Sequence, residues 1–134
     1  MDNIQLPRPL VNTLLHQAQI SPEREICGLI GALNGTPVSV YPVANVADHP
    51  DMLFRMAPQE QIAAMRRLRE AGETLFAIYH SHPHADARPS ARDLAEAAYP
   101  DALYLIISLN TEGVLEMRAF RLNQERFEPA PLMI

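Results

Sequence analysis

The stretch from residue 74 to residue 93 constrains this chain most, because an apolar run leads directly into closely spaced polar residues. Residues 74–79 read Thr-Leu-Phe-Ala-Ile-Tyr, a run of β-formers that predicts a buried strand. His80 and His82 stand at the end of that run. Side chains two residues apart on a strand lie on the same face, so both imidazoles could bind one metal ion. Asp93 could supply an oxygen ligand from the element that follows.

The pattern of apolar residues predicts a single α/β domain over residues 1–134, built from a mixed sheet flanked by about three helices. Helices are expected over residues 8–19, from Pro58 to Gly72 and from Ser90 to Pro100. Strands are expected in the second half of residues 23–33 and over residues 38–41, 53–56, 74–80, 102–108 and 114–122. Phe127 onward is expected to form a last edge strand or a tail.

Local signals refine this layout. Asn34-Gly35 predicts a hairpin turn. Pro37 and Pro42 indicate that the returning strand lies at a sheet edge or contains a bulge. In the second helix, three apolar residues at helical spacing are expected to form the packing face: Ile62, Met65 and Leu68.

Composition narrows the classes of function. No apolar run is long enough to cross a membrane, and the first residues lack the basic and apolar regions of a signal peptide, so a cytoplasmic protein is expected. The net charge of −5 argues against a nucleic-acid partner. The basic run over residues 66–69 has glutamates around it, which is typical of a solvated helix face.

A metal in this chain would need histidine and carboxylate ligands, because the only cysteine, Cys27, excludes a multi-cysteine cage. Catalytic zinc takes three protein ligands and leaves a fourth position for water. His80, His82 and Asp93 supply such a set. A carboxylate close to the metal but not bound to it would then be needed for proton transfer. Glu25 is the best placed candidate for that carboxylate, and Glu23 is its competitor.

Ser90 and Cys27 each allow two interpretations. The Ser90 hydroxyl could hydrogen-bond the oxyanion that forms when water attacks a carbonyl. The spacing Ser-x-x-Asp is also that of a helix capping box, which would explain Ser90 and Asp93 without catalysis, and the two roles are compatible. Cys27 could be a nucleophile with His80 near it, but its apolar surroundings favour a small buried thiol.

At these positions the chain resembles the JAMM (MPN+) metallopeptidases, small prokaryotic type. The family pattern His-Ser-His-Pro-x6-Ser-x-x-Asp matches His80, His82, Ser90 and Asp93 in register. The segment Glu-Ile-Cys-Gly-Leu-Ile-Gly over residues 25–31 is similar to the family's glutamate segment, and this similarity selects Glu25 over Glu23.

The resemblance implies a JAMM/MPN (cytidine-deaminase-like) fold over residues 1–134 and a zinc (iso)peptidase with one Zn²⁺. His80, His82 and Asp93 would bind zinc, Glu25 would act as general base and then acid, and Ser90 would steady the tetrahedral intermediate. The implied substrate is the C-terminal tail of a ubiquitin-like or sulfur-carrier β-grasp protein. Neither nucleic acid nor membrane is implied as a partner, and the oligomeric state stays open.

Three other functions are weighed against the metallopeptidase. An MPN scaffold would bind partners without catalysis, although such members usually lose metal ligands. A DNA-repair-associated relative of the RadC type shares a similar metal motif, but it would bind DNA, which the acidic balance opposes. A zinc nucleobase deaminase requires a Pro-Cys-x-x-Cys pair, which the single Cys27 excludes.

Overall fold

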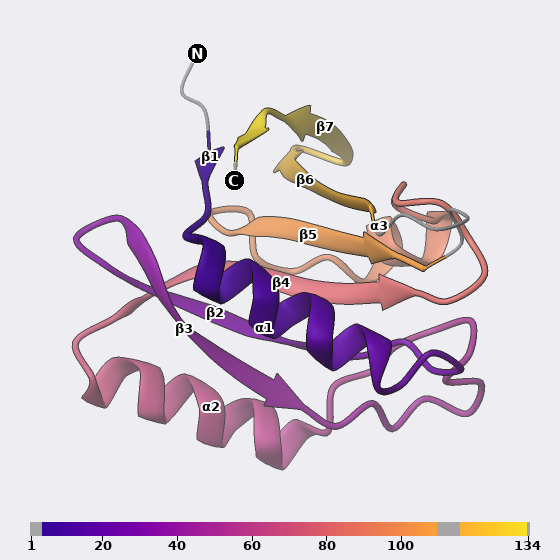
Figure 1. The fold of residues 1–134 in the computed structure, drawn as a ribbon, viewed down its shortest axis with the longest axis horizontal. Helices are drawn as coiled ribbons and strands as arrows, with labels where there is room; N and C mark the ends of the chain where they lie inside the picture. The colour runs from indigo at the N-terminus through magenta and orange to yellow at the C-terminus, as the bar shows by residue number, and fades with distance from the viewer. Residues whose placement is uncertain (1–3, 110–115, 134) are drawn as a thin grey trace.

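A computed structural model describes residues 4–109 and 116–133. They form a six-stranded sheet in the order β3-β2-β4-β5-β6-β7 and a separate parallel pair of short strands, β1 and β8 (Figure 1). The strands are β1 (Ile4–Gln5), β2 (Cys27–Leu33), β3 (Thr36–Val43), β4 (Thr74–His82), β5 (Leu103–Ser108), β6 (Glu116–Asn123), β7 (Arg126–Ala130) and β8 (Leu132–Met133). The helices are α1 (Arg8–Gln19), α2 (Pro58–Glu70) and α3 (Ala91–Glu96).

The sheet is mixed, as the sequence predicted. β4 pairs with β5 in parallel, and the other pairs of the six-stranded sheet are antiparallel. Because β4 and β5 run in the same direction, their carboxyl ends meet at one edge of the sheet, where His82 pairs with Ser108. Ligand sites of α/β sheets tend to lie outside the carboxyl ends of the strands. The two histidines therefore end β4 at a position suited to a site.

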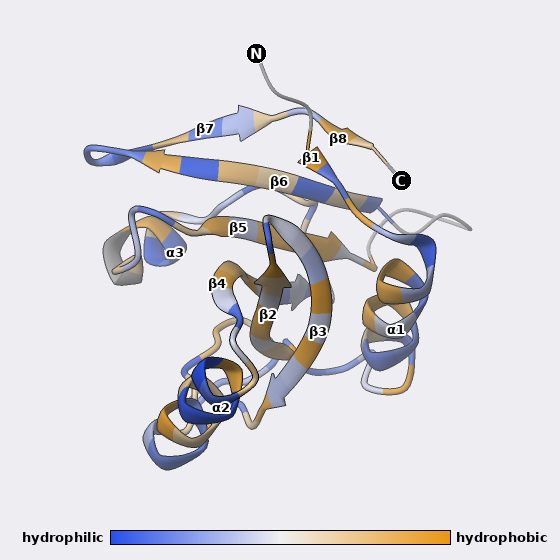
Figure 2. Ribbon diagram, turned by 90° about the vertical axis from the view of Figure 1, so that its left-hand side faces the viewer, coloured by the Kyte–Doolittle hydropathy of each residue, from blue (hydrophilic) through white to orange (hydrophobic). Residues whose placement is uncertain are grey.

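Two apolar clusters cover the two faces of the sheet, with α1 on one side and α2 on the other (Figure 2). Along β4 the side chains alternate between these faces. Ala77 and Tyr79 pack with α1, whereas Ile78 packs in the cluster that includes Ala64 of α2. The same alternation places His80 on the α2 side and Ser81 on the α1 side. None of the helices in the described part of the chain is long and apolar enough to cross a membrane.

The hairpin between β2 and β3 confirms the turn signal. Asn34 and Gly35 have φ values of 50° and 81°, the left-handed conformations that a two-residue I′ turn requires. β3 is an edge strand. Its pairing with β2 shifts register between Gly31 and Ala32 of β2, which is a bulge or irregularity. The structure therefore has both the edge position and the irregularity that the prolines of β3 indicated. The expected last strand is also present, since β7 forms the opposite edge.

Four details differ from the sequence prediction. Ile62 was expected to pack but is 60% exposed, because α2 instead turns Ala64 and Leu68 toward the sheet. Residues 53–56 form no strand; Met56 makes one isolated bridge with Asn45, and Arg55 is exposed between the half-buried Phe54 and the buried Met56. α3 ends at Glu96, well before Pro100. β4 runs two residues beyond the expected end and includes both histidines. Of the strand expected over 114–122, residues 114 and 115 lie outside the described residues.

Candidate metal centre

His80 and His82 bring their imidazoles together at the end of β4. Both are buried, with 1% and 4% of their surface exposed. Their Nε2 atoms lie 3.0 Å apart, which follows from the two-residue spacing on one face of the strand. Nδ1 of His82 is 2.7 Å from the carbonyl oxygen of Asp86. A carbonyl only accepts, so Nδ1 carries the proton and the Nε2 lone pair is left for a ligand.

Asp93 reaches the same point from the first turn of α3. Its Oδ2 is 3.2 Å from Nε2 of His80 and 3.3 Å from Nε2 of His82. The predicted capping box is present: the Asp93 N–H donates to Oγ of Ser90 (3.0 Å), and the Ser90 N–H donates to Oδ2 of Asp93 (2.8 Å). The carboxylate therefore has a fixed position between the helix end and the histidines.

Nε2 of His80, Nε2 of His82 and Oδ2 of Asp93 form a triangle with the dimensions of a metal site. At Zn–N and Zn–O distances of about 2.0–2.1 Å, two ligands of a tetrahedral zinc are about 3.3 Å apart. The sides of 3.0, 3.2 and 3.3 Å match that separation. The residues present therefore fit a divalent metal with nitrogen and oxygen ligands. Buried side chains that share lone pairs at such distances need a cation or protons between them.

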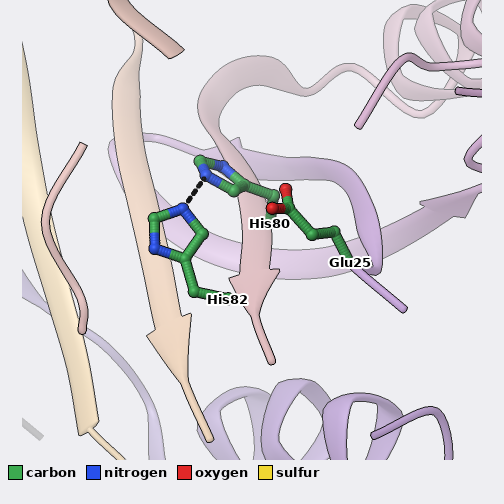
Figure 3. A group of neighbouring side chains, drawn as sticks. All are labelled: Glu25, His80 and His82. Atoms are coloured by element: carbon green, nitrogen blue, oxygen red, sulfur yellow. Dashed lines mark hydrogen bonds between the residues drawn. The ribbon is translucent and has the colours of Figure 1, made fainter. Parts of the chain in front are cut away.

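Glu25 lies beside this triangle on the segment that leads into β2. Its side chain is 4% exposed, and one of its carboxylate oxygens is within 4.8 Å of the ligand nitrogens of His80 and His82 (Figure 3). Oε1 of Glu25 is buried and has no hydrogen-bond partner among the described residues. Glu25 could itself be a fourth ligand or serve as a proton acceptor next to the ligands. Glu23, its competitor in the sequence, is exposed, whereas Glu25 is buried and forms a group of close donor atoms with His80 and His82.

Burial and mutual charge shift the pKa of each of these groups. Burial raises the pKa of Glu25 to about 8, opposed by His82 and supported by Asp93. Burial alone would raise the pKa of Asp93, but the contacts with both histidines outweigh it and hold the pKa well below its usual range. Burial lowers the pKa of His80. Burial would also lower the pKa of His82, but the contact with Asp93 raises it above the usual value.

Ser81, between the two histidines, is a structural part of the site that the sequence reasoning missed. Its hydroxyl accepts a hydrogen bond from the Ile26 N–H (2.8 Å), and its own N–H donates to the Ile26 carbonyl (3.0 Å). These bonds continue the pairing of β4 with β2 beyond Cys27 and hold the segment of Glu25 against the histidine strand. The signal was available, because a residue between two ligands on a strand must point to the opposite face.

Asn45 and Phe54 also belong to the surroundings of the site, although they lie far from it in sequence. The side-chain amide of Asn45 donates to the carbonyl oxygen of Glu25 (2.9 Å). The Phe54 ring stacks on the His80 ring, with centroids 4.4 Å apart and an angle of 22° between the planes. Residues 53–56 were expected to form a strand, and no local pattern indicated that Phe54 would turn toward His80.

Two cavities border the side chains of this triangle. One, of about 170 Å³, borders His80 and Asp93, and aromatic and aliphatic side chains such as Phe54 and Tyr104 dominate its walls. The other, of about 260 Å³, borders His82 and contains Glu25 and Ser90. His80, His82 and Asp93 therefore each line a cavity, and concave pockets of this kind are where small ligands and peptide segments bind.

Cys27 does not have the surroundings of a nucleophile. It is fully buried, its thiol donates to the Val43 carbonyl (3.4 Å), and burial raises its pKa to about 12. A thiol with that pKa is almost entirely protonated at neutral pH, and the thiolate is the nucleophilic form. The thiol-enzyme interpretation is therefore wrong.

Comparison with known proteins places this fold and site among JAMM-type metalloprotease domains. The family model described as prokaryotic homologs of the JAB domain matches residues 7–123. The chain belongs to this family, which confirms the resemblance drawn from residues 80–93. A JAB1/MPN domain protein from Archaeoglobus fulgidus shares the fold at a TM-score of 0.60 and 14% identity, over 99% of this chain and all of the other.

Two curated relatives and one solved structure are more similar in sequence. The desampylase of Haloferax volcanii is 35% identical over 89 residues, 65% of this chain and 64% of that protein, so the match spans just under two thirds of its length. The CysO-cysteine peptidase of Mycobacterium tuberculosis is 31% identical over 115 residues, 84% of this chain and 78% of the other. A protein of Desulfitobacterium hafniense has a TM-score of 0.85 and 31% identity, over 97% of this chain and 91% of the other.

Proposed function

We propose that this protein is a zinc peptidase that hydrolyses an amide bond at the C-terminal tail of a ubiquitin-like or sulfur-carrier protein. The observation that carries the proposal is the triangle of His80, His82 and Asp93 with the buried carboxylate of Glu25 beside it. The substrate class is supported by the relatives, which are named a desampylase and a CysO-cysteine peptidase. Residues 1–134 would form the catalytic domain, acting in the cytoplasm.

His80, His82 and Asp93 would hold the zinc ion. When bound there, zinc supplies a Lewis acid that activates water at neutral pH and polarises the substrate carbonyl. Among the described residues Oε1 of Glu25 has no hydrogen-bond partner, and Glu25 lies within a water's reach of the ligands. Burial favours its protonated form, but a bound cation would favour the carboxylate, which could then take the proton of the attacking water. The same carboxylic acid then donates that proton to the nitrogen of the leaving amine.

Ser90 would hydrogen-bond the oxyanion of the tetrahedral intermediate. Its Oγ already accepts the Asp93 N–H, which fixes the oxygen but leaves the hydroxyl hydrogen available for donation. Ser90 is exposed and lines the cavity that contains Glu25. The cap and the catalytic role use different parts of the same hydroxyl, so the two interpretations of Ser90 are compatible in this geometry.

The two cavities suggest how the substrate would lie. Glu25 must reach the leaving nitrogen, so the leaving group would occupy the cavity that contains Glu25 and Ser90. The acyl side of the tail would then cross the cavity bordered by His80 and Asp93. Because apolar walls dominate that cavity, an apolar side chain of the tail near the cleaved bond would fit it better than a charged one.

Mass spectrometry of a β-grasp sulfur-carrier protein with a C-terminal extension tests the proposal. Zinc-loaded protein should shorten the carrier, and both a chelator and His82→Ala should stop the reaction. His84→Ala is the matched control, because His84 is exposed in the following loop. The rival scaffold function predicts a protein with no stoichiometric zinc and no shortened carrier. One zinc per chain, lost in His82→Ala, together with cleavage would exclude it.

A further inference from the structure

Two buried groups of the site have no hydrogen bond at the atom where one would be expected. Within the described residues, neither Oε1 of Glu25 nor Nδ1 of His80 has a partner. A histidine that binds a metal through one ring nitrogen is usually oriented by a hydrogen bond at the other. His82 follows that rule through its bond to the Asp86 carbonyl. His80 and Glu25 must therefore be oriented in another way.

The amide of Asn45 makes four hydrogen bonds, which is the full capacity of a side-chain amide. Its Nδ2 donates to the carbonyl oxygens of Glu25 and Leu53, both at 2.9 Å. Its Oδ1 accepts the N–H groups of Ala47 and Arg55, both at 3.0 Å. A residue bonded at every position is strongly fixed, and it fixes the backbone of each partner in turn.

Two of these bonds enclose Phe54. Leu53 and Arg55 are its neighbours on either side, so the backbone that carries the Phe54 ring is held before and after it. That ring stacks on His80 at a centroid distance of 4.4 Å. The stack covers one face of the His80 imidazole, whose Nδ1 has no partner among the described residues, so the ring contact is what orients it.

A third bond holds the backbone of Glu25. The Asn45 amide binds its carbonyl oxygen, and the Pro50 carbonyl, from the same loop as Phe54, accepts the Glu25 N–H at 2.6 Å. Because Oε1 has no partner among the described residues, the position of the Glu25 carboxylate depends on this backbone. One side chain thus supports the proton carrier and a metal ligand at the same time.

We propose that Asn45 is a positioning residue that sets the orientation of both Glu25 and His80, the latter through Phe54. This inference rests on the proposed function of the site. It predicts that a change at Asn45 alters metal binding as well as turnover, although Asn45 is not a ligand. A residue that only stabilises the loop would lower the melting temperature and leave the geometry of the bound metal unchanged.

The test is a double-mutant cycle on the Co²⁺-substituted full-length protein. Asn45→Asp removes the two donated bonds and keeps the accepted ones, and Phe54→Leu removes the stacking ring. Each should weaken Co²⁺ binding about 10-fold or more, as loss of an outer partner does, and change the visible spectrum of the bound ion. The two losses should not add, because both variants act through the same contact.

Three further proteins complete the design. Phe54→Tyr keeps the ring and should restore the wild-type spectrum and affinity. Val46→Ala changes an exposed apolar residue in the same loop and should leave both unchanged. Glu25→Gln, the third, should lower kcat while keeping the wild-type spectrum. Asn45→Asp should likewise lower kcat at unchanged KM, but with a changed spectrum.

The results distinguish a wrong metal site from a wrong positioning role of Asn45. If wild-type protein binds no Co²⁺, the metal site itself is wrong. If it binds Co²⁺ but Asn45→Asp and Phe54→Leu keep the wild-type spectrum and affinity, only the positioning role is wrong. Should Asn45→Asp not fold, the Phe54→Leu and Phe54→Tyr pair decides, since equal spectra from the two would overturn the proposal.

Discussion

Two loops support the candidate metal centre in different ways. The near support is residues 83–90, which follow the histidines directly, hold His82 through the Asp86 carbonyl and lead to the Ser90 cap. The remote support is residues 44–57, which hold Glu25 through Asn45 and cover His80 with Phe54. The near support acts on groups within a dozen residues of it. The remote support acts across the fold, so it depends on tertiary structure being formed first.

Asp93 gives the largest expected effect and tests the near support. Asp93→Ala should abolish zinc binding, because it removes one of three ligands, and should cost about 1 kcal/mol of stability through the lost cap. Asp93→Asn keeps an oxygen that can accept the Ser90 N–H but is a poorer ligand, so zinc should be lost with little change in melting temperature. Zinc analysis and thermal unfolding of both variants provide the measurements. Full zinc content in Asp93→Ala would exclude Asp93 as a ligand.

Glu25 tests the group that the remote support holds. Glu25→Gln should keep one zinc per chain and reduce turnover by a factor of about 10²–10⁴, the usual contribution of a general acid–base group. Initial rates with a fixed carrier substrate, together with metal analysis, would show this. A variant without zinc would make Glu25 a ligand, and a fully active variant would remove it from the mechanism. Glu23→Gln is the control, since Glu23 is exposed two residues away.

Ser90 comes next and separates capping from catalysis. Ser90→Ala should reduce turnover by a factor of about 10² through loss of a donor to the oxyanion, and should cost about 1 kcal/mol of stability. Ser90→Gly loses the same donor but costs a cap only a few tenths of a kcal/mol. Equal turnover in the two variants with unequal stability supports the catalytic role. If turnover followed melting temperature instead, the serine would act only as a cap.

The histidine strand and the Ser90 cap could be predicted from the sequence, whereas the Asp86 contact with His82 and the remote support could not. Strand periodicity, a two-residue spacing and the Ser-x-x-Asp pattern are local signals, and each was confirmed in β4 and α3. Glu25 was a candidate from its place at the start of a strand, but only the family resemblance selected it over Glu23, because nothing near it in sequence shows that it meets His80. Phe54 was misassigned to a strand. Its segment forms one bridge, and the stacking on His80 has no local pattern.

Ser81 joins the histidine strand β4 to the segment of Glu25, and its removal should have a smaller effect, mainly on stability. Ser81→Ala leaves the buried Ile26 N–H without its partner at 2.8 Å, which should cost about 1–3 kcal/mol. Zinc content should stay at one per chain, since both histidines remain on β4. Chemical unfolding and metal analysis test this. Loss of zinc in Ser81→Ala would mean that the ligands themselves depend on this bond.

Cys27 should give the smallest effect, and it tests whether the start of β2 stays closed next to His80. The thiol is fully buried, is paired with the Val43 carbonyl and has a pKa raised to about 12, so iodoacetamide should not label it in the native protein at pH 7 to about 8. Labelling should become complete in denaturant, which provides the internal control by intact mass. Native labelling at a measurable rate would show that β2 separates from β4 at Cys27. In that case the segment that carries Glu25, which leads directly into β2, would not stay fixed beside the histidines.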